Sequence, residues 1–337
     1  MTFFKTSILS AISTIIKIAS GLVINKIIAV YIGPAGIAII GQFQNFLGII
    51  TTIGNGAINS GVTKYVAEYN GIDKEKRNNI ISVAFIITII CSSIIGAILF
   101  FGSSFFSNWI LKTEEYKTIF NLLGILLIFI SLNTVLLSVI NGMKRIKMFI
   151  TINILSSILS LGITSLLTIK YELLGALIAI IFVQAVVLLI TLPIAIAQIE
   201  IPFPFKKINK IFYQKLFGFS LMAVVSVISV SVTQIMIRNH LIDSFSIEEA
   251  GYWQSVWMIS STYLLVLTTA FSTYYLPKLS ELQDLVELRK EILSGYKIIL
   301  PFVFITALLI YLFRDVIIYV LFTPDFIEMR SLFLFPV

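Results

Sequence analysis

Reactive and charged residues are scarce in this 337-residue sequence. It holds one cysteine and one histidine, and only 12% of its residues are charged. Cys91 alone cannot form an intramolecular disulfide, and His240 lacks the companion ligands that a metal site needs. We therefore expect no disulfide, no metal site and no cofactor.

Catalytic motifs are missing as well. The phosphate-binding pattern G-x-x-x-x-G-K-[ST] does not occur, so we do not expect the chain to hydrolyse ATP. The few ionisable residues form no nucleophile–base constellation, and no basic, aromatic-interleaved patch suggests nucleic acid. The absence of these motifs favours a protein that is not an enzyme.

Apolar residues dominate what remains. They make up 58% of the sequence and the mean hydropathy is +1.02, whereas soluble domains are roughly 45–50% apolar and about 25% charged. Apolar runs of about 20 residues, the length that spans a bilayer, recur throughout, and they are continuous rather than alternating. The sequence predicts an all-α polytopic membrane protein with apolar runs at 8–30, 38–62, 80–102, 118–140, 150–169, 173–197, 216–238, 252–276, 298–320 and from about 331.

Positive charge is distributed unevenly between the two sides of this topology. Sixteen of the 24 Lys and Arg residues fall in loops on the side of the N-terminus, and six fall on the other side. Positive charge favours the cytoplasmic side and anionic headgroups, so we expect membrane lipids as partners and a cytoplasmic N-terminus.

An internal repeat divides the chain. Ala35-Gly36 corresponds to Ala250-Gly251 at an offset of 215, and residues 97–113 resemble residues 307–323 at an offset of 210. We expect an N-terminal six-helix lobe over residues 1–200 and a C-terminal lobe over residues 201–337 that holds about four of its six helices, with the C-terminal helices missing.

Polar residues form stripes within the apolar runs. In 38–62 they recur every three or four residues, which places them on one helix face: Gly41, Asn45, Gly48, Thr52, Asn55, Asn59 and Thr63. Similar faces carry Asn153, Ser157, Ser160 and Thr164 in 150–169, and Gln254 and Ser261 in 252–276. Small and hydroxyl residues suit helix packing, whereas Asn45, Asn55 and Asn59 favour a water-filled cavity because buried amides are costly.

Charged residues inside the runs are sharper markers, because an ionisable group near the bilayer centre usually faces a cavity. Lys17 is the clearest case; Lys26 can reach the interface or, if the helix bends at Gly21, the same cavity. Arg238 is a candidate for the outer rim of the cavity or for an interfacial anchor. Lys64 and Glu68 form an i, i+4 pair that fits either a gate or simple positive-inside placement.

Several segments resemble one known family: STIIKIASGL (13–22), INKIIAVYIGPAGIA (24–38), NSGVTKYVAEY (59–69), YWQSVWMISSTYL (252–264), AFSTYYLPKLSEL (270–282) and LFRDVIIYVLFTPDF (312–326). They are similar to the Wzx-type lipid-linked oligosaccharide flippases, which translocate enterobacterial common antigen or O-antigen units, in the multidrug/oligosaccharidyl-lipid/polysaccharide (MOP) exporter superfamily. The resemblance covers essentially the whole chain.

That resemblance implies a two-lobe MATE-like bundle in the bacterial inner membrane that moves undecaprenyl-pyrophosphate-linked glycan outward by alternating access. It implies that Lys17 and Lys26 face the pyrophosphate, and that Arg238, Gln254, Ser261 and the asparagines of 38–62 meet sugar or headgroup. A glycan polymerase and a chain-length regulator are the implied protein partners. Ser261 and Thr262 occupy the place where relatives carry a carboxylate. This difference argues against proton coupling through that helix. A drug antiporter, a membrane glycan polymerase and a non-transporting scaffold are the alternatives.

Overall fold

Helices and the turns between them make up the described structure. The computed structural model describes residues 3–199, 210–270 and 284–334, and strands do not occur in these ranges. The elements are α1 Phe3–Gly54, α2 Asn59–Tyr69, α3 Lys74–Phe101, α4 Ser103–Leu111, α5 Lys117–Gly142, α6 Ile146–Gln198, α7 Lys210–Ser244, α8 Ile247–Ala270, α10 Leu285–Leu312, α11 Arg314–Leu321 and the 3₁₀-helix η2 Pro324–Leu334.

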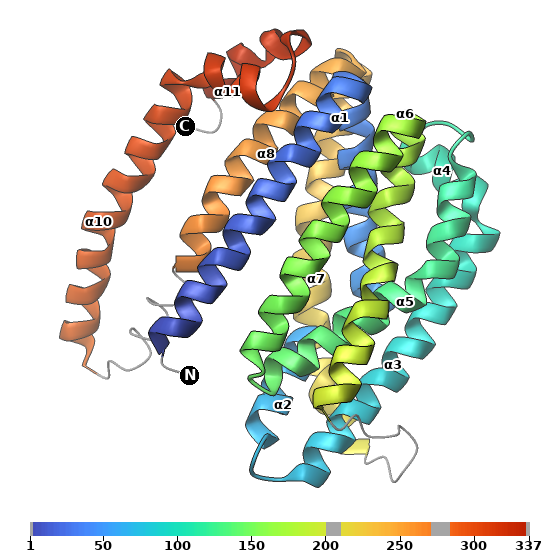
Figure 1. Ribbon diagram of the computed structural model, residues 1–337, viewed down its shortest axis with the longest axis vertical. Helices are drawn as coiled ribbons and strands as arrows, with labels where there is room; N and C mark the ends of the chain where they lie inside the picture. The colour runs from blue at the N-terminus through green and yellow to red at the C-terminus, as the bar shows by residue number, and fades with distance from the viewer. Residues whose placement is uncertain (1–2, 200–209, 271–283, 335–337) are drawn as a thin grey trace.

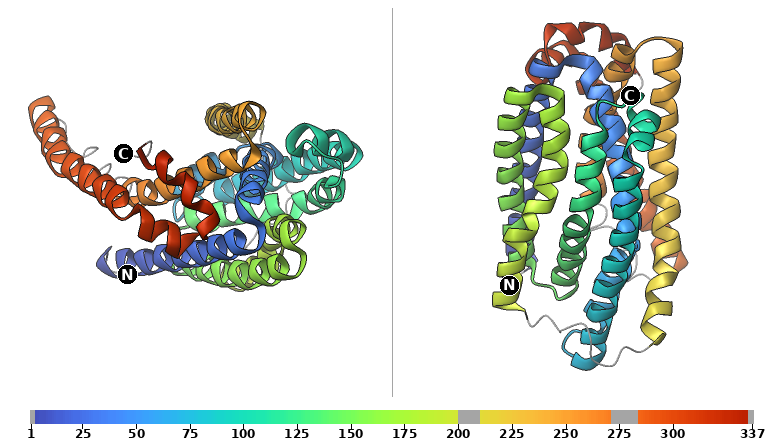
Figure 2. Two further views of the ribbon diagram at one scale, coloured as in Figure 1. Left: turned by 90° about the horizontal axis from the view of Figure 1, so that it is seen from above. Right: turned by 90° about the vertical axis from the view of Figure 1, so that its right-hand side faces the viewer.

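Two of these helices are hairpins. At 1.5 Å per residue the 52 residues of α1 would extend about 78 Å, more than twice the roughly 30 Å of a bilayer core. The helix bends at Gly33, whose φ of 74° suits a glycine, and Pro34 starts the returning half. The 53-residue α6 bends in the same way at Glu172, with a φ of 48°. Each therefore crosses twice, as Figures 1 and 2 show.

The remaining long helices complete a membrane-spanning bundle. Within the described residues, six helical stretches are long and apolar enough to cross a membrane: Leu9–Gly54, Lys74–Phe101, Lys117–Gly142, Ile146–Gln198, Ile211–Ser244 and Val286–Leu312. With the two hairpins and α8, which packs along α1, these account for the first nine predicted runs. The end of the run 252–276 lies outside the described residues, as do residues 335–337 of the run from 331, whose first residues belong to η2.

The bundle has two distinct ends. The turns from α2 to α3 and from α5 to α6 lie at one end, which we call the basic end. The bends of α1 and α6, together with α11 and η2, lie at the opposite end, which we call the far end (Figure 1). Between them α3 and α5 approach so closely that a Cβ on Gly96 would meet the Gly124 carbonyl oxygen at 2.5 Å, which is the small-residue packing of membrane helices.

The expectation of one continuous helix over 38–62 is wrong. Helix α1 ends at Gly54 and α2 begins at Asn59, with Gly56 and Ala57 at φ 71° and 54°. The side-chain Oδ1 of Asn55 accepts a hydrogen bond of 2.9 Å from the Ala57 N–H. Asparagine and glycine favour such turns, so the polar stripe does not follow a single helix face through this break.

Helix α10 also differs from the predicted run 298–320. It begins at Leu285 and ends at Leu312, and α11 follows after Phe313. Within the described chain α10 packs only on α11 and η2, and Figure 1 and the left view of Figure 2 show it standing away from the other long helices.

Candidate functional site

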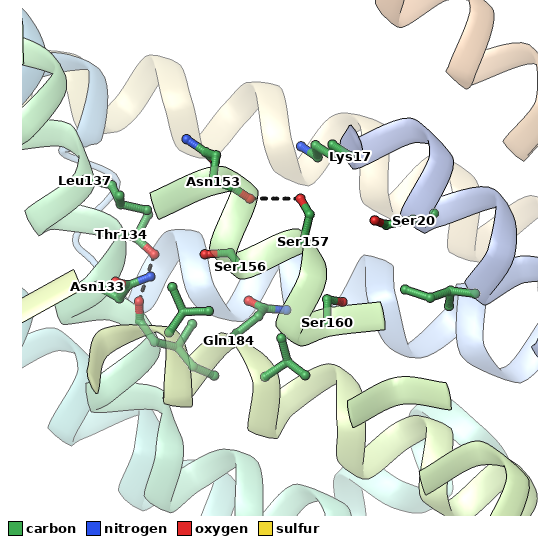
Figure 3. Close-up of a pocket in the computed structure, with 15 residues that line it drawn as sticks. Lys17, Ser20, Asn133, Thr134, Leu137, Asn153, Ser156, Ser157, Ser160 and Gln184 are labelled. Carbon is green, nitrogen blue, oxygen red and sulfur yellow. Dashed lines mark hydrogen bonds between the residues drawn. The ribbon is translucent and has the colours of Figure 1, made fainter. Parts of the chain in front are cut away.

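A polar cavity lies among the first half of α1, α5 and both halves of α6. Its volume is about 370 Å³. The polar residues that line it are Lys17, Ser20, Asn133, Thr134, Asn153, Ser156, Ser157, Ser160 and Gln184. Figure 3 shows them around one hollow, with Lys17, Asn153 and Ser157 along one edge. The predicted polar face of 150–169 thus lines a cavity.

Lys17 is the one charged residue among those that line this cavity. Helix α1 begins at Phe3, so Lys17 lies about 21 Å along it, well inside the bilayer thickness. Its side chain is exposed to the cavity rather than sealed between helices. A cation held at this depth is a functional marker.

The hydroxyls and amides around Lys17 are oriented by their own helices. Ser156 and Ser157 donate to the carbonyl oxygens of Ile152 and Asn153 at 2.7 and 2.9 Å. Each serine oxygen therefore keeps its lone pairs as acceptors. These serine oxygens on the cavity wall can accept hydrogen bonds from hydroxyl groups of a ligand. The Oδ1 of Asn133 is buried and has no hydrogen-bond partner.

A second cavity of about 300 Å³ continues the first toward the far end. The two share the lining residues Gly21, Ile24, Ser160, Val183 and Gln184. The second adds Asn25, Gln44 and Gln254, and the buried Oε1 of Gln254 has no hydrogen-bond partner. The described residues that line the two cavities include no Asp or Glu, so the fixed charge that they supply is positive.

Arg238 lies fully buried in the far half of α7, at 0% exposure. It donates to Gln42 Oε1 at 2.7 Å, and Gln42 Nε2 donates to Asn239 Oδ1 at 2.9 Å. The guanidinium lies 5.9 Å from the ring centre of Trp253, while its Nε and one Nη have no partner. Arg238 is therefore not the interfacial anchor that the sequence left open.

The structure gives Lys26 a different setting from Lys17. Its ammonium donates to the carbonyl oxygens of Tyr319, at 2.9 Å, and of Phe322. These carbonyls lie at the C-terminal end of α11, where a cation is stabilising. Lys26 does not line either cavity; it ties α1 to α11.

The remaining candidates are scattered. The expected cavity role of Asn55 is not supported, because this buried side chain closes the turn after Gly54. Asn45 and Asn59 line neither cavity. Ser261 is exposed and donates to its own helix at Met258.

The proposed gating pair also separates. Lys64 and Glu68 are exposed, and the described structure contains no ion pair between them. The Lys64 ammonium instead lies over the rings of Tyr65 and Phe219, at 5.4 and 5.1 Å. Sequence reasoning missed Gln42, Asn133 and Gln184, although an amide in an apolar run is itself a signal.

Fold and site together define a class of protein. The multi-pass helical bundle has the fold of the MOP superfamily transporters. It matches the inward-facing conformation of a multidrug resistance MATE family transporter with a TM-score of 0.74 and 15% identity, over 95% of this chain and 79% of that one. It also matches a MOP superfamily transporter from Pyrococcus furiosus, described by a reversed polarity of its binding pocket, with a TM-score of 0.68 and 18% identity, over 99% and 79% of the two chains.

Sequence comparison specifies the family. The chain belongs to the polysaccharide biosynthesis protein family, whose model matches residues 3–283. It is 28% identical to the Lipid III flippase of Escherichia coli (strain K12) and equally to that of Shigella flexneri, over 99% of this chain and 80% of each relative.

Proposed function

We propose that the protein is a flippase for a lipid-linked oligosaccharide, carrying an undecaprenyl-pyrophosphate-linked O-antigen or enterobacterial common antigen unit to the periplasmic leaflet. The observation that carries this proposal is the pair of joined polar cavities with Lys17 as their fixed charge. Family membership and the likeness to Lipid III flippases support it. A carrier of cationic drugs would be expected to present carboxylates, and the described lining of these cavities includes none.

The physical role of the cavities is to replace water around a polar headgroup. Moving a pyrophosphate and sugars through hydrocarbon would strip their hydrogen bonds at several kcal/mol each. Lys17 offers an ammonium to the pyrophosphate, and the serines, Asn153 and Gln184 offer hydrogen bonds to sugar hydroxyls. The lipid tail stays in the bilayer. Gln254 and Arg238 would meet the glycan further toward the far end.

Alternating exposure needs two bodies that rock against each other. We assign these bodies to residues 1–200 and 201–337. We place the protein in the bacterial inner membrane with its N-terminus in the cytoplasm, on the distribution of Lys and Arg. A glycan polymerase and a chain-length regulator would act on the delivered product.

Lys17→Met tests the proposal against its matched control Lys26→Met. Losing a charge-assisted hydrogen bond costs about 1.5–3 kcal/mol, so Lys17→Met should lower translocation roughly 10- to 100-fold without changing thermal stability. Lys26→Met should lower the stability by about 1–3 kcal/mol, through its lost carbonyl contacts, and largely retain translocation.

The measurements are surface glycan in a flippase-null bacterial strain, membrane protein level by immunoblot, and melting of the purified protein. Normal surface glycan with Lys17→Met would reject the pyrophosphate role. Restoration of drug resistance in place of glycan display would favour the antiporter alternative.

A further inference from the structure

A third pocket, which we call the basic pocket, lies at the basic end of the bundle. Its volume is about 710 Å³. The turn from α2 to α3, the turn from α5 to α6 and the end of α6 form it, through Asn70, Gly71, Ile72, Lys74, Arg77, Met143, Lys144, Arg145, Gln198 and Ile199. It shares no lining residue with the two cavities of the transport site.

Cations dominate the lining of the basic pocket. Lys74, Arg77, Lys144 and Arg145 come from two separate connections, and the described residues that line the pocket include no Asp or Glu. Two carboxylates, Asp73 and Glu75, flank Lys74 in the sequence, and neither lines the pocket. Asp73 is engaged elsewhere. It accepts the Lys76 N–H at 3.0 Å, which lowers the pKa of Asp73, and it pairs with the Lys76 ammonium at 3.0 Å.

Neutral side chains hold Arg77 in place. Its Nη2 and Nε donate to Asn78 Oδ1 at 3.1 and 3.3 Å, and Nη1 lies 3.4 Å from Asn70 Oδ1. Asn70 in turn donates to the Met143 carbonyl oxygen at 3.3 Å, which joins the two turns. The guanidinium is thus positioned without being neutralised, so its charge remains available to an anion.

An exposed apolar residue lies beside these cations. Ile72 lines the pocket and is 84% exposed. The basic end of a membrane-spanning bundle lies at the level of the headgroups, where an isoleucine can enter the acyl-chain region. The pocket therefore combines several cations with an apolar edge, which suits an amphipathic anion.

We propose that the basic pocket binds the phosphodiester headgroup of an anionic phospholipid. Arg77 and Arg145 can each present a guanidinium fork to phosphate oxygens, Lys144 adds a third charge, and Ile72 contacts the acyl chains. This site is independent of the transport cavities, so it holds whether or not the proposed glycan is the cargo.

The test compares lipid binding by the purified full chain and its variants in detergent. The probes are phosphatidylglycerol, with phosphatidylcholine as the neutral lipid and glycerol phosphate and inorganic pyrophosphate as soluble anions. Bound lipid is counted by native mass spectrometry, and affinity is taken from the shift in melting temperature. The variant is Lys144→Asn with Arg145→Gln, because both side chains are exposed and asparagine tolerates the φ of 57° at position 144.

Each cation removed near the headgroups should weaken binding about fivefold, from roughly 1 kcal/mol per charge, and the double variant about 30-fold. The matched control is Lys147→Gln, an exposed cation three residues after Lys144 that does not line the pocket. It should retain the affinity for phosphatidylglycerol within about twofold.

Three outcomes would overturn the proposal. The double variant could keep its preference for phosphatidylglycerol, or Lys147→Gln could lose as much as the double variant, which would indicate a diffuse surface charge. Soluble pyrophosphate could displace the lipid at equal concentration, which would assign the pocket to a free anion. Translocation is measured separately, so its failure in Lys17→Met does not affect this result.

Discussion

At the scale of single residues, Arg238 is the most unusual side chain in the described bundle. It is fully buried, and Gln42 supplies its one hydrogen bond there. A buried cation without a carboxylate partner destabilises a fold, so a structural role explains it poorly. Arg238 lies 5.9 Å from the ring centre of Trp253 and lines neither cavity, so we propose that it meets substrate in a conformation that exposes it.

Removing the charge should therefore cost less than removing its partner. The free energy of unfolding of Arg238→Met should lie within about 1–2 kcal/mol of the wild-type value. The variant loses the hydrogen bond to Gln42, but it also removes the cost of burying a charge. Gln42→Met leaves the cation without any partner and should cost about 3–5 kcal/mol. Denaturation of both variants in detergent measures this.

The double variant Arg238→Met with Gln42→Met completes the cycle and should recover most of the stability lost in Gln42→Met. If Arg238 contacts substrate, Arg238→Met should also fail to restore surface glycan although it folds. Equal stability losses in the two single variants would contradict the argument.

Residue-level prediction rested on polarity alone. Lys17 was expected to face a cavity, and it lines one, because a deep cation has few alternatives in lipid. Asn153, Ser157 and Ser160 were expected only to share a polar face, and they line the same cavity. Polarity alone could not show whether Lys26 faces the cavity or makes a structural contact. Its partners are backbone carbonyls of α11, almost 300 residues away. No sequence spacing encodes such a contact.

At the scale of elements, the turn between α1 and α2 is a break that helical periodicity concealed. Its signal was the Asn55-Gly56 pair, a common turn sequence, within an otherwise apolar run. Hydropathy identifies membrane spans, but it does not register local hydrogen bonds such as the one from Ala57 to Asn55.

Asn55→Ala should lower the free energy of unfolding by about 1–3 kcal/mol, because the buried Ala57 N–H loses its side-chain acceptor. Asn59→Ala is the matched control on the same stripe. Its buried Oδ1 has no partner, so its removal should be neutral or slightly stabilising. Thermal melting of the two variants in detergent checks this, and a larger loss for Asn59→Ala would contradict it.

The helices show a similarity that fits the predicted repeat. Helix α3 ends at Phe101 and its C-cap Gly102 has φ −94° and ψ 14° before the short α4, and α10 ends at Leu312 and its C-cap Phe313 has φ −94° and ψ 13° before the short α11. The two caps lie 211 residues apart, within the two segments that match at an offset of 210. The agreement supports the proposed division of the chain into two related lobes.

At the scale of the whole molecule, the number and order of spans followed from composition and length. Composition and length did not predict the bends of α1 and α6, the position of α10 or the connection between the two cavities. These features depend on contacts between distant helices. The central physical requirement is that water reaches Lys17 within the bundle.

Cysteine accessibility measures this hydration directly, because the chain has a single natural cysteine. In a Cys91→Ala background, Lys17→Cys should react with a membrane-impermeant thiol reagent at least about tenfold faster than Ile15→Cys, because the thiolate that reacts needs water. Ile15 is 65% exposed but lines neither cavity, so it reports the lipid-facing surface. Similar rates at the two positions would remove the basis of the translocation model.

The unpaired guanidinium nitrogens of Arg238 have a further consequence for the conformational balance of the protein. If only apolar side chains closed the far end, the described conformation would have a much lower free energy than any conformation open at that end. In a conformation that hydrates Arg238, its Nε and its second Nη would gain the hydrogen bonds that they lack in the described conformation. This reduces the free-energy difference between the two conformations. If the protein alternates its exposure as proposed, burial of Arg238 therefore lowers the free-energy cost of opening at that end.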